Sequence, residues 1–185
     1  MTLPTPAPSF QWTSRHNTSP VLKGLADEVW DYERGCAVRK AVPEDAHILA
    51  PKLRPEDLRE IRAVTLGDPG KAMEKGILES PYTYTITIKG EVVAIFGVNH
   101  YSPTVGVIWL LGSNDLLKEK IAFLRQSPKW LEAFHELYPI LFNVVCLWNK
   151  LHIDWLKWLG FRFIREYKEY GLNKEPYIEF LSVKL

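Results

Sequence analysis

The sequence has few cysteines and almost no net charge. Its 185 residues include two cysteines, and 23 basic residues are offset by 22 acidic ones, for a formal charge of +1. Neither Cys36 nor Cys146 has a second cysteine or a nearby histidine at the spacing of a zinc site, so the sequence predicts neither a disulfide framework nor a metal centre. A net charge near zero provides no overall attraction to nucleic acid or to an anionic membrane. We therefore expect neither of these partners.

The sequence also lacks a long apolar run. No stretch approaches the ~20 apolar residues that a membrane-spanning helix needs, and the first 20 residues show no basic segment followed by an apolar block. We therefore expect an intracellular protein. An apolar content of 46% suits one globular domain, because a chain of this length buries roughly 70% of the surface that its unfolded form exposes.

Prolines are concentrated at the N-terminus. Four of the thirteen prolines lie in the first 20 residues, among Thr, Ser and Asn, and this part of the chain has no helical or strand period. We expect residues 1–30 to form an arm and a lead-in, and residues 31–185 to form the folded domain. Phe10 and Trp12 leave two alternatives for the arm, which is either docked in extended form on a surface or disordered.

Three helix starts share one pattern of proline and acidic residues. Pro43 and Pro55 are each followed by two acids, and Pro69 follows Asp68. Proline is favoured at the first helical position because its missing N–H is not needed there, and acidic side chains interact well with the positive end of the helix dipole. The sequence therefore predicts three helices after a first strand at residues 35–40.

The hydrophobic period changes after these helices. From residue 82 to 88, aromatic and β-branched residues alternate with threonines, which is typical of a strand. Lys89–Gly90 predicts a tight turn into a second strand at 92–98, and a loop with Asn99 and His100 leads to a third strand at 105–111. We expect the three strands to be antiparallel.

The rest of the chain alternates between helical and strand patterns. The remaining expected elements are a helix at 116–124, a second one restarted by Ser127–Pro128, a strand at 142–148, a helix at 149–159 and a hairpin of 161–170 with 177–183. The predicted order is β, two or three α, βββ, α, β, α, ββ.

This order resembles the GCN5-related N-acetyltransferase (GNAT) fold over about residues 35–183. The most specific part is Asn149–Phe161, a helix that starts at an asparagine and ends in Leu-Gly-Phe. The resemblance implies an α/β domain with a mixed, mostly antiparallel central sheet flanked by helices, here with a proline-rich N-terminal arm. Within the fold, Trp109–Gly112 and Phe123–Ser127 resemble segments of small tailed-phage proteins of the internal virion protein A type. That second resemblance implies a phage-encoded protein, located in the host cytoplasm or associated with the virion.

The GNAT resemblance also implies a cofactor site. Acetyl-CoA would enter a wedge between the strands that end at residues 111 and 148, where backbone N–H groups would stabilise the oxyanion. The cofactor-binding residues implied in this way are Leu110, Leu111, Gly112, Ser113 and Asn149. Asn149 can also act simply as a helix cap.

The turn that would hold the pyrophosphate departs from the family pattern. It contains the single Gly112, and Asp115 places a negative charge where a phosphate would lie. An ordinary N-cap formed by Ser113, Asn114 or Asp115 is the simpler interpretation of this turn.

The acid and base of the family pattern are also incomplete. The position that commonly carries a tyrosine as general acid is Leu156 in this chain. His100 and His152 are the candidate bases, because an unperturbed histidine has a pKa of about 6.5. Either of them can instead be a solvated or structural histidine.

Two functions are therefore consistent with the sequence. The first is an acetyl-CoA-dependent N-acetyltransferase whose acceptor is a protein lysine, an aminoglycoside-like molecule or a polyamine. The second is a non-catalytic GNAT-fold module that serves in a virion or its assembly, or binds a host protein. The missing glycines and tyrosine favour the module, and the wedge-forming elements favour the enzyme. The seven tryptophans suit a protein interface, to which the N-terminal arm would contribute.

Overall fold

The structure is a computed structural model that describes residues 20–25, 28–31 and 33–184, so the proline-rich arm with Phe10 and Trp12 lies outside the described residues. The helices are α1 (Pro20–Leu25), α2 (Pro43–Leu49), α3 (Pro55–Val64), α4 (Pro69–Glu79), α5 (Lys120–His135) and α6 (Lys150–Trp158), with 3-10 helices η1 (Ala50–Lys52) and η2 (Asn114–Glu119). The strands are β1 (Val29–Asp31), β2 (Cys36–Lys40), β3 (Thr83–Ile88), β4 (Glu91–Ser102), β5 (Val105–Gly112), β6 (Ile140–Cys146), β7 (Arg162–Tyr170) and β8 (Glu175–Val183).

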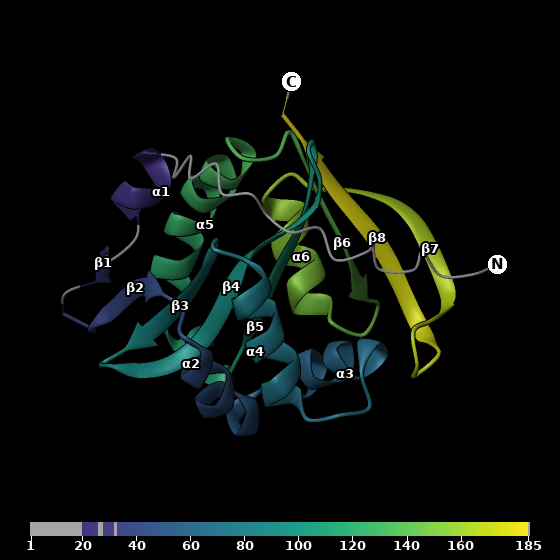
Figure 1. Ribbon diagram of the computed structural model, residues 1–185, viewed down its shortest axis with the longest axis horizontal. Coiled ribbons are helices and arrows are strands. Elements are labelled where there is room, and N and C mark those ends of the chain that lie inside the picture. Colours follow the sequence, from purple (N-terminus) through teal and green to yellow (C-terminus); the bar gives the residue numbers. More distant parts are fainter. Residues whose placement is uncertain (1–19, 26–27, 32, 185) are drawn as a thin grey trace.

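The described strands form one sheet of eight strands (Figure 1). Their order is β1-β2-β3-β4-β5-β6-β8-β7, and every neighbouring pair is antiparallel except β5 and β6. The predicted mixed, mostly antiparallel sheet flanked by helices is confirmed. The short β1 was not expected from the sequence.

The three proline-opened helices start where the sequence predicts. α2, α3 and α4 each have proline as their first residue. Asp68 accepts a hydrogen bond of 2.9 Å from the N–H of Lys71, and Asp45 accepts one of 3.0 Å from the N–H of Val42. Each bond satisfies an N–H at a helix start that has no partner within the helix.

Two predicted boundaries are wrong. α5 is one helix that continues through Pro128, whereas the sequence predicted a restart at this residue. A proline inside a helix costs about 3 kcal/mol, but Phe123 before the proline and the buried Trp130 and Phe134 after it pack on the same core cluster and hold both halves of α5 against the sheet. β4 extends to Ser102, so Asn99 and His100 lie in a strand rather than in a loop.

The helices cover the sheet on both faces (Figure 1). α2, α3 and α4 pack on one face, where Ile61 and Met73 share a core cluster with Trp109. α5 packs on the other face, and Trp130 lies 4.5 Å from the ring of Tyr84, measured between ring centroids. Because side chains alternate along a strand, β5 contributes residues to both cores, and its odd-numbered positions face α2–α4.

The segment before β2 also contributes to the core. Leu22 of α1 is buried in the cluster beneath α5, and Glu28 accepts a backbone hydrogen bond from Val38. The division of the chain at residue 30 stays a prediction.

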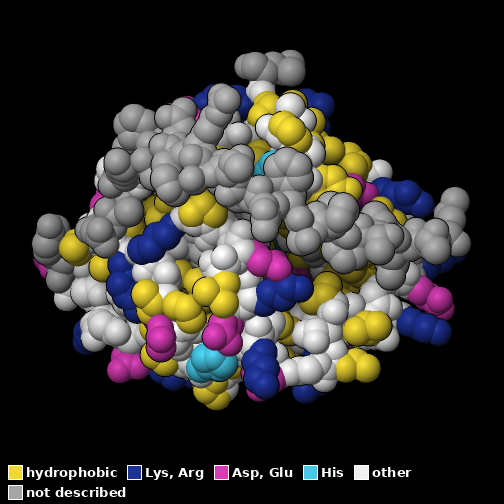
Figure 2. All heavy atoms as spheres, in the orientation of Figure 1, with side chains coloured by type: hydrophobic (Ala, Val, Ile, Leu, Met, Phe, Trp, Pro, Cys, Tyr) yellow, Lys and Arg dark blue, Asp and Glu magenta, His cyan; other side chains and the backbone are white. Residues whose placement is uncertain are grey.

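Two further observations concern the outer surface. Among the described residues, no helix is both long enough and apolar enough to cross a membrane. On the face shown in Figure 2, the described Lys and Arg side chains lie interspersed with Asp and Glu instead of forming a patch of one sign.

Candidate functional site

The expected wedge is present between β5 and β6. These strands are paired at only three positions, Val105 with Ile140, Gly106 with Leu141 and Val107 with Phe142. β5 continues to residue 112 and β6 to residue 146, so the two strands separate beyond this point and leave a slot in the sheet.

Asn143 forms the closed end of the slot. Its side-chain Nδ2 donates a hydrogen bond of 2.8 Å to the carbonyl oxygen of Ile108, and its Oδ1 accepts one of 2.8 Å from the N–H of Val144. The side chain therefore replaces a backbone hydrogen bond at the point where the ladder stops. This satisfies the Ile108 carbonyl without drawing the strands together.

The backbone of Leu110 points into the slot. In an antiparallel pair the residues alternate between those that bond the partner strand and those that face away from it. The N–H of Ser113 donates to the Val93 carbonyl of β4 at 2.8 Å. By this alternation, the backbone groups of Leu111 also face β4, whereas Leu110 and Gly112 direct their N–H and C=O groups toward β6.

Helix α3 holds the two separated strand ends through two carboxylates. Asp57 Oδ2 accepts a hydrogen bond of 2.7 Å from the N–H of Gly112, at the end of β5. Glu60 Oε1 accepts one of 3.3 Å from the N–H of Cys146, at the end of β6. Positions three apart lie on the same face of a helix, so one face of α3 spans the slot.

Asp57 is paired with a buried arginine. Arg54 donates to Asp57 through Nε at 3.1 Å and through Nη2 at 2.6 Å. Burial raises the pKa of Asp57, while the hydrogen bonds and charge of Arg54 oppose this shift. A bidentate pair of this kind is strongly oriented, so the Asp57 carboxylate is held in place by its hydrogen bonds to Arg54 and to the N–H of Gly112.

Glu60 is a half-buried residue, and among the described residues no arginine forms an ion pair with its carboxyl group. Burial raises the pKa of Glu60 to about 8, the charge of Asp57 adds to this effect, and a hydrogen bond from Asn149 opposes it. Near pH 7 the group is therefore mostly protonated, and it becomes a carboxylate just above neutrality. A carboxyl group with this property at the mouth of a slot is suited to accept a proton.

Asn149 caps α6 and also faces the slot. Its Oδ1 accepts a hydrogen bond of 3.4 Å from the N–H of His152. Its Nδ2 donates to Glu60 Oε1 at 2.9 Å and lies 3.5 Å from both Asp57 Oδ1 and His152 Nδ1. Asn149 is therefore the helix cap that the sequence allowed, and the same side chain also contacts Glu60 at the slot, while its role in cofactor binding stays a prediction.

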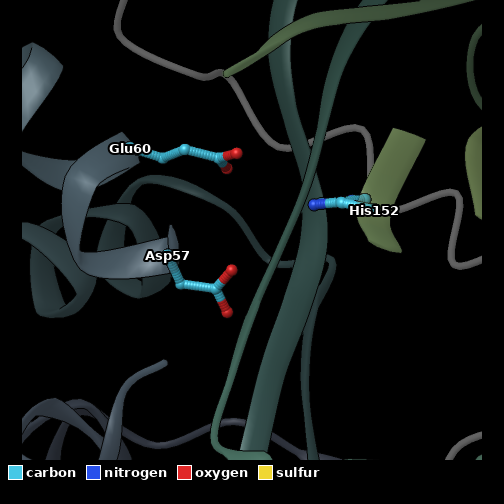
Figure 3. A group of neighbouring side chains, drawn as sticks. All are labelled: Asp57, Glu60 and His152. Carbon is cyan, nitrogen blue, oxygen red and sulfur yellow. The ribbon is translucent and has the colours of Figure 1, made fainter. Parts of the chain in front are cut away.

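His152 reaches the slot from the first turn of α6, opposite the two carboxylates of α3 (Figure 3). Burial lowers its pKa to about 3, and the charge of Arg54 adds to this effect. The imidazole is therefore neutral at physiological pH, and its ring lies 5.2 Å from that of Trp155. It can accept a hydrogen bond, but a pKa this low makes it a weak base.

The donor atoms of Asp57, Glu60 and His152 lie within 4.8 Å of one another, which is close enough to consider a metal site. The Nδ2 of Asn149 lies among them at hydrogen-bond distances, and Arg54 already neutralises Asp57. A zinc ion would need ligand atoms at about 2.0–2.2 Å. These residues therefore form a hydrogen-bonded network centred on an amide rather than a set of metal ligands.

A cavity of about 370 Å³ passes through the sheet at the slot. It is bounded by Ile61 and Met73 on the α3–α4 side, by Asn143 in the sheet, and by Phe123 and Trp155 on the α5–α6 side. Glu60 and His152 also line it.

The other predicted site residues lie in different places. Leu110 and Leu111 line the cavity. His100 pairs with Gly106 at the opposite end of β5, where its Nδ1 lies 3.3 Å from the hydroxyl of Tyr138. The structure therefore does not bring His100 to the slot.

The turn after β5 is occupied by its own residues. Ser113 caps η2 and accepts a hydrogen bond of 3.3 Å from the N–H of Asp115, as the simpler interpretation of this turn predicted. Asp115 forms an ion pair of 2.6 Å with Lys118. A short 3-10 helix begins here, so this turn does not offer the row of free N–H groups that a pyrophosphate requires.

Sequence reasoning missed Arg54, Asp57 and Glu60. Their spacing of three residues places them on one face of α3, which was a usable signal. Such a polar face usually contacts solvent, however, and only the packing of α3 against β6 buries it.

Comparisons with known proteins identify the fold. No protein-family model and no curated protein matches this chain. Ard1 from Thermoplasma volcanium is 14% identical, with a TM-score of 0.65 over 82% of this chain and 99% of that one. RimL, a ribosomal L7/L12 alpha-N-protein acetyltransferase in complex with coenzyme A, is 12% identical, with a TM-score of 0.62 over 84% and 98%. A GNAT-family acetyltransferase from Bacillus anthracis is 10% identical, with a TM-score of 0.60 over 80% and 94%. The chain therefore has a GNAT-like fold.

Proposed function

We propose that this protein is an acetyl-CoA-dependent N-acetyltransferase in which Glu60 accepts the proton of the acceptor amine. The observation that carries the proposal is a buried carboxyl group with a raised pKa at the open end of the slot between β5 and β6. The structural neighbours support it, since several of them are acetyltransferases and one is in complex with coenzyme A.

The slot suits the acyl end of the cofactor. The N–H of Leu110 points into it and would hold the oxygen on which negative charge develops. Acetyl-CoA, when bound, would supply the acetyl group. After Glu60 has taken one proton from the ammonium, the amine nitrogen would form the amide bond as the C–S bond breaks, and the proton that the nitrogen then loses would go to the departing sulfur, so that CoA leaves as the thiol. The turn after β5 does not suit the diphosphate, because Asp115 and the internal bonds of η2 occupy it.

Glu60 takes the role of base in this proposal for two reasons. His100 pairs with Gly106 near the first residue of β5, away from the slot, and burial lowers the pKa of His152 to about 3. His152 instead keeps Asn149 in place, and Asn149 orients Glu60 through the 2.9 Å hydrogen bond. Since the acceptor arrives as an ammonium ion, turnover requires Glu60 as a carboxylate and should rise with pH through about 8, where half of Glu60 is deprotonated, before it levels off.

A non-catalytic role is the second candidate, and the α5–α6 side of the cavity favours it. The ring centroids of Phe123 and Trp155 lie 5.1 Å apart, and Trp155 Nε1 donates to Ser127 Oγ at 3.3 Å. These contacts join α5 to α6 on the side of the cavity from which a cofactor would have to enter. Trp148 and Trp158 are 57% and 56% exposed, which suits a protein interface. The role would be that of a phage-encoded virion or assembly component, or a host-protein binder in the host cytoplasm.

Thermal unfolding with acetyl-CoA separates the two candidates. A ligand at ~100 times its Kd stabilises the folded state by about 2.7 kcal/mol, so the enzyme should show a clear rise in Tm. Glu60→Gln should retain this rise but lose about 10²–10⁴-fold in kcat. Glu56→Gln, on the same helix, is the matched control and should keep full activity. No change in Tm at millimolar acetyl-CoA would reject the enzyme and leave the non-catalytic role.

A further inference from the structure

We infer that the acceptor is a primary amine on an apolar body, with no second charge close to the reacting nitrogen. The inference rests on the proposed function, because it concerns what occupies the cavity beside Glu60. Three features carry it: the walls of the cavity, its charges and the rigidity of one wall.

The cavity on the α3–α4 side has apolar walls. Ile61 and Val64 line it from α3, Met73 and Gly76 from α4, and Trp109 from β5. Ile61 and Met73 are buried in the core, whereas Val64 is 68% exposed and therefore lies toward the solvent. An acceptor that enters past Val64 must replace water with contacts to hydrocarbon and indole, which favours an apolar substituent.

The charges of the cavity suit a single amine. Among the residues that the structure describes, the ionisable side chains that line the cavity are Glu60, His152 and Tyr170. Burial lowers the pKa of His152 and raises that of Tyr170, so both are neutral at pH 7. Glu60 can take up one ammonium group, and a second one would be desolvated without a partner. This disfavours polyamines and aminoglycoside-like molecules.

The indole of Trp109 forms a fixed wall. Its Nε1 donates a hydrogen bond of 2.5 Å to Asn99 Oδ1, and Asn99 Nδ2 donates one of 3.4 Å to the carbonyl of Gly76. A Cβ at Gly76 would meet the ring of Trp109 at 3.5 Å. The space between α4 and Trp109 therefore depends on the missing side chain of Gly76.

Three sources of amine share the required chemistry. They are a small apolar monoamine, the N-terminus of a polypeptide that begins with an apolar residue, and the ammonium of a lysine on its four-carbon stem. The probes are phenethylamine, a peptide with an N-terminal leucine, and an N-acetylated peptide with one lysine. Spermidine and a peptide with an N-terminal aspartate are the charged counterparts.

Steady-state acetylation of this panel tests the inference. We expect kcat/KM for the preferred apolar probe to exceed that for spermidine and for the aspartyl peptide by at least about tenfold, because burial of an unpaired charge is costly. Whichever apolar probe reacts best identifies the source. Equal acetylation of spermidine would overturn the inference and leave the proposed function intact. No product with any amine, together with no rise in Tm on adding acetyl-CoA, would reject the proposed function and this inference with it.

Two variants change the cavity in opposite ways. Gly76→Leu should fill the space beside Trp109 and lower kcat/KM for the best apolar probe by at least about tenfold, while the Tm rise with acetyl-CoA persists; leucine is also a better helix former than glycine. Lys75→Leu places the same side chain at an exposed position of α4 and is the control. Val64→Asp should raise kcat/KM for spermidine about threefold to fivefold, the size of a partly exposed ion pair. If Gly76→Leu has no effect, the amine does not enter this side of the cavity, and the inference is wrong.

Discussion

At the scale of single residues, the site depends on how two neighbouring carboxyl groups differ. Asp57 and Glu60 lie one helical turn apart, yet Asp57 is paired with Arg54, whereas the donors to Glu60 within the described part of the chain are an amide and a backbone N–H. Burial raises the pKa of Glu60 to about 8, and the charge of Arg54, which is paired with Asp57, opposes this shift only in part. Asp57 thus holds the end of β5 through the N–H of Gly112, whereas Glu60 can gain or lose a proton near neutral pH.

The raised pKa of Glu60 predicts a pH-dependent stability. In the unfolded chain this carboxyl group releases its proton near the ordinary glutamate pKa of 4.5, whereas in the folded chain it does so near 8. The free energy of unfolding should therefore fall as the pH rises between these values. Glu60→Gln removes this dependence. The free energy of unfolding of the variant, relative to that of the wild type, should therefore rise by roughly a few kcal/mol from pH 5 to pH 9. Urea unfolding at the two pH values measures the difference. The same change in unfolding free energy with pH in both proteins would contradict the prediction.

The Arg54–Asp57 pair predicts a large loss of stability when it is broken. Asp57→Asn leaves a buried guanidinium without its partner, which costs about 3–5 kcal/mol. Lys75→Ala breaks the exposed pair with Glu79, whose side chains are 75% and 56% accessible, and should cost no more than about 1 kcal/mol. Chemical unfolding of both variants compares the two pairs, and a similar loss in each would show that the burial of Arg54 is not decisive.

At the scale of elements, the slot results from a helix and a side chain that act in place of a strand ladder. α3 bonds the end of β5 through Asp57 and the end of β6 through Glu60, and Asn143 closes the inner end. Each bond satisfies a backbone group that paired strands would have satisfied themselves. Two β-strands can therefore separate inside the sheet without leaving these groups unpaired.

Replacement of Asn143 should weaken the sheet at this point. Asn143→Leu removes the donor to the Ile108 carbonyl and the acceptor of the Val144 N–H, and a buried unsatisfied group costs about 1–3 kcal/mol. Hydrogen exchange at the Val144 amide should accelerate accordingly, while the amides of β3 remain protected. Asn114→Leu, at an exposed position, is the control. Unchanged exchange at Val144 would mean that Asn143 does not hold the slot.

At the scale of the whole molecule, the two helical layers meet through the slot. The apolar space between α3 and α4 and the space between α5 and α6 form one cavity because the sheet is open between β5 and β6. A donor and an acceptor can thus approach the same point from opposite faces. The proposed chemistry needs this arrangement, since two reactants must be held together away from water.

The sequence by itself determined most of the elements from β2 to β8 and their order. Proline and acidic residues marked the starts of α2, α3 and α4, and the alternation from Tyr82 to Ile88 marked β3, because capping and periodicity act over a few residues. It also located the separating strands and Asn149 through the GNAT resemblance. It failed at Pro128, where packing against the sheet outweighs a local preference.

Only the tertiary structure decided which residues form the site. Asn149 Nδ2 lies 3.5 Å from Asp57 Oδ1, although 92 positions separate them in the chain. The sequence pointed to histidines because a free imidazole titrates near neutrality, but burial moves Glu60 into that range and His152 out of it. A pKa depends on what surrounds a group after distant segments have packed together, and no local pattern in the chain contains that information.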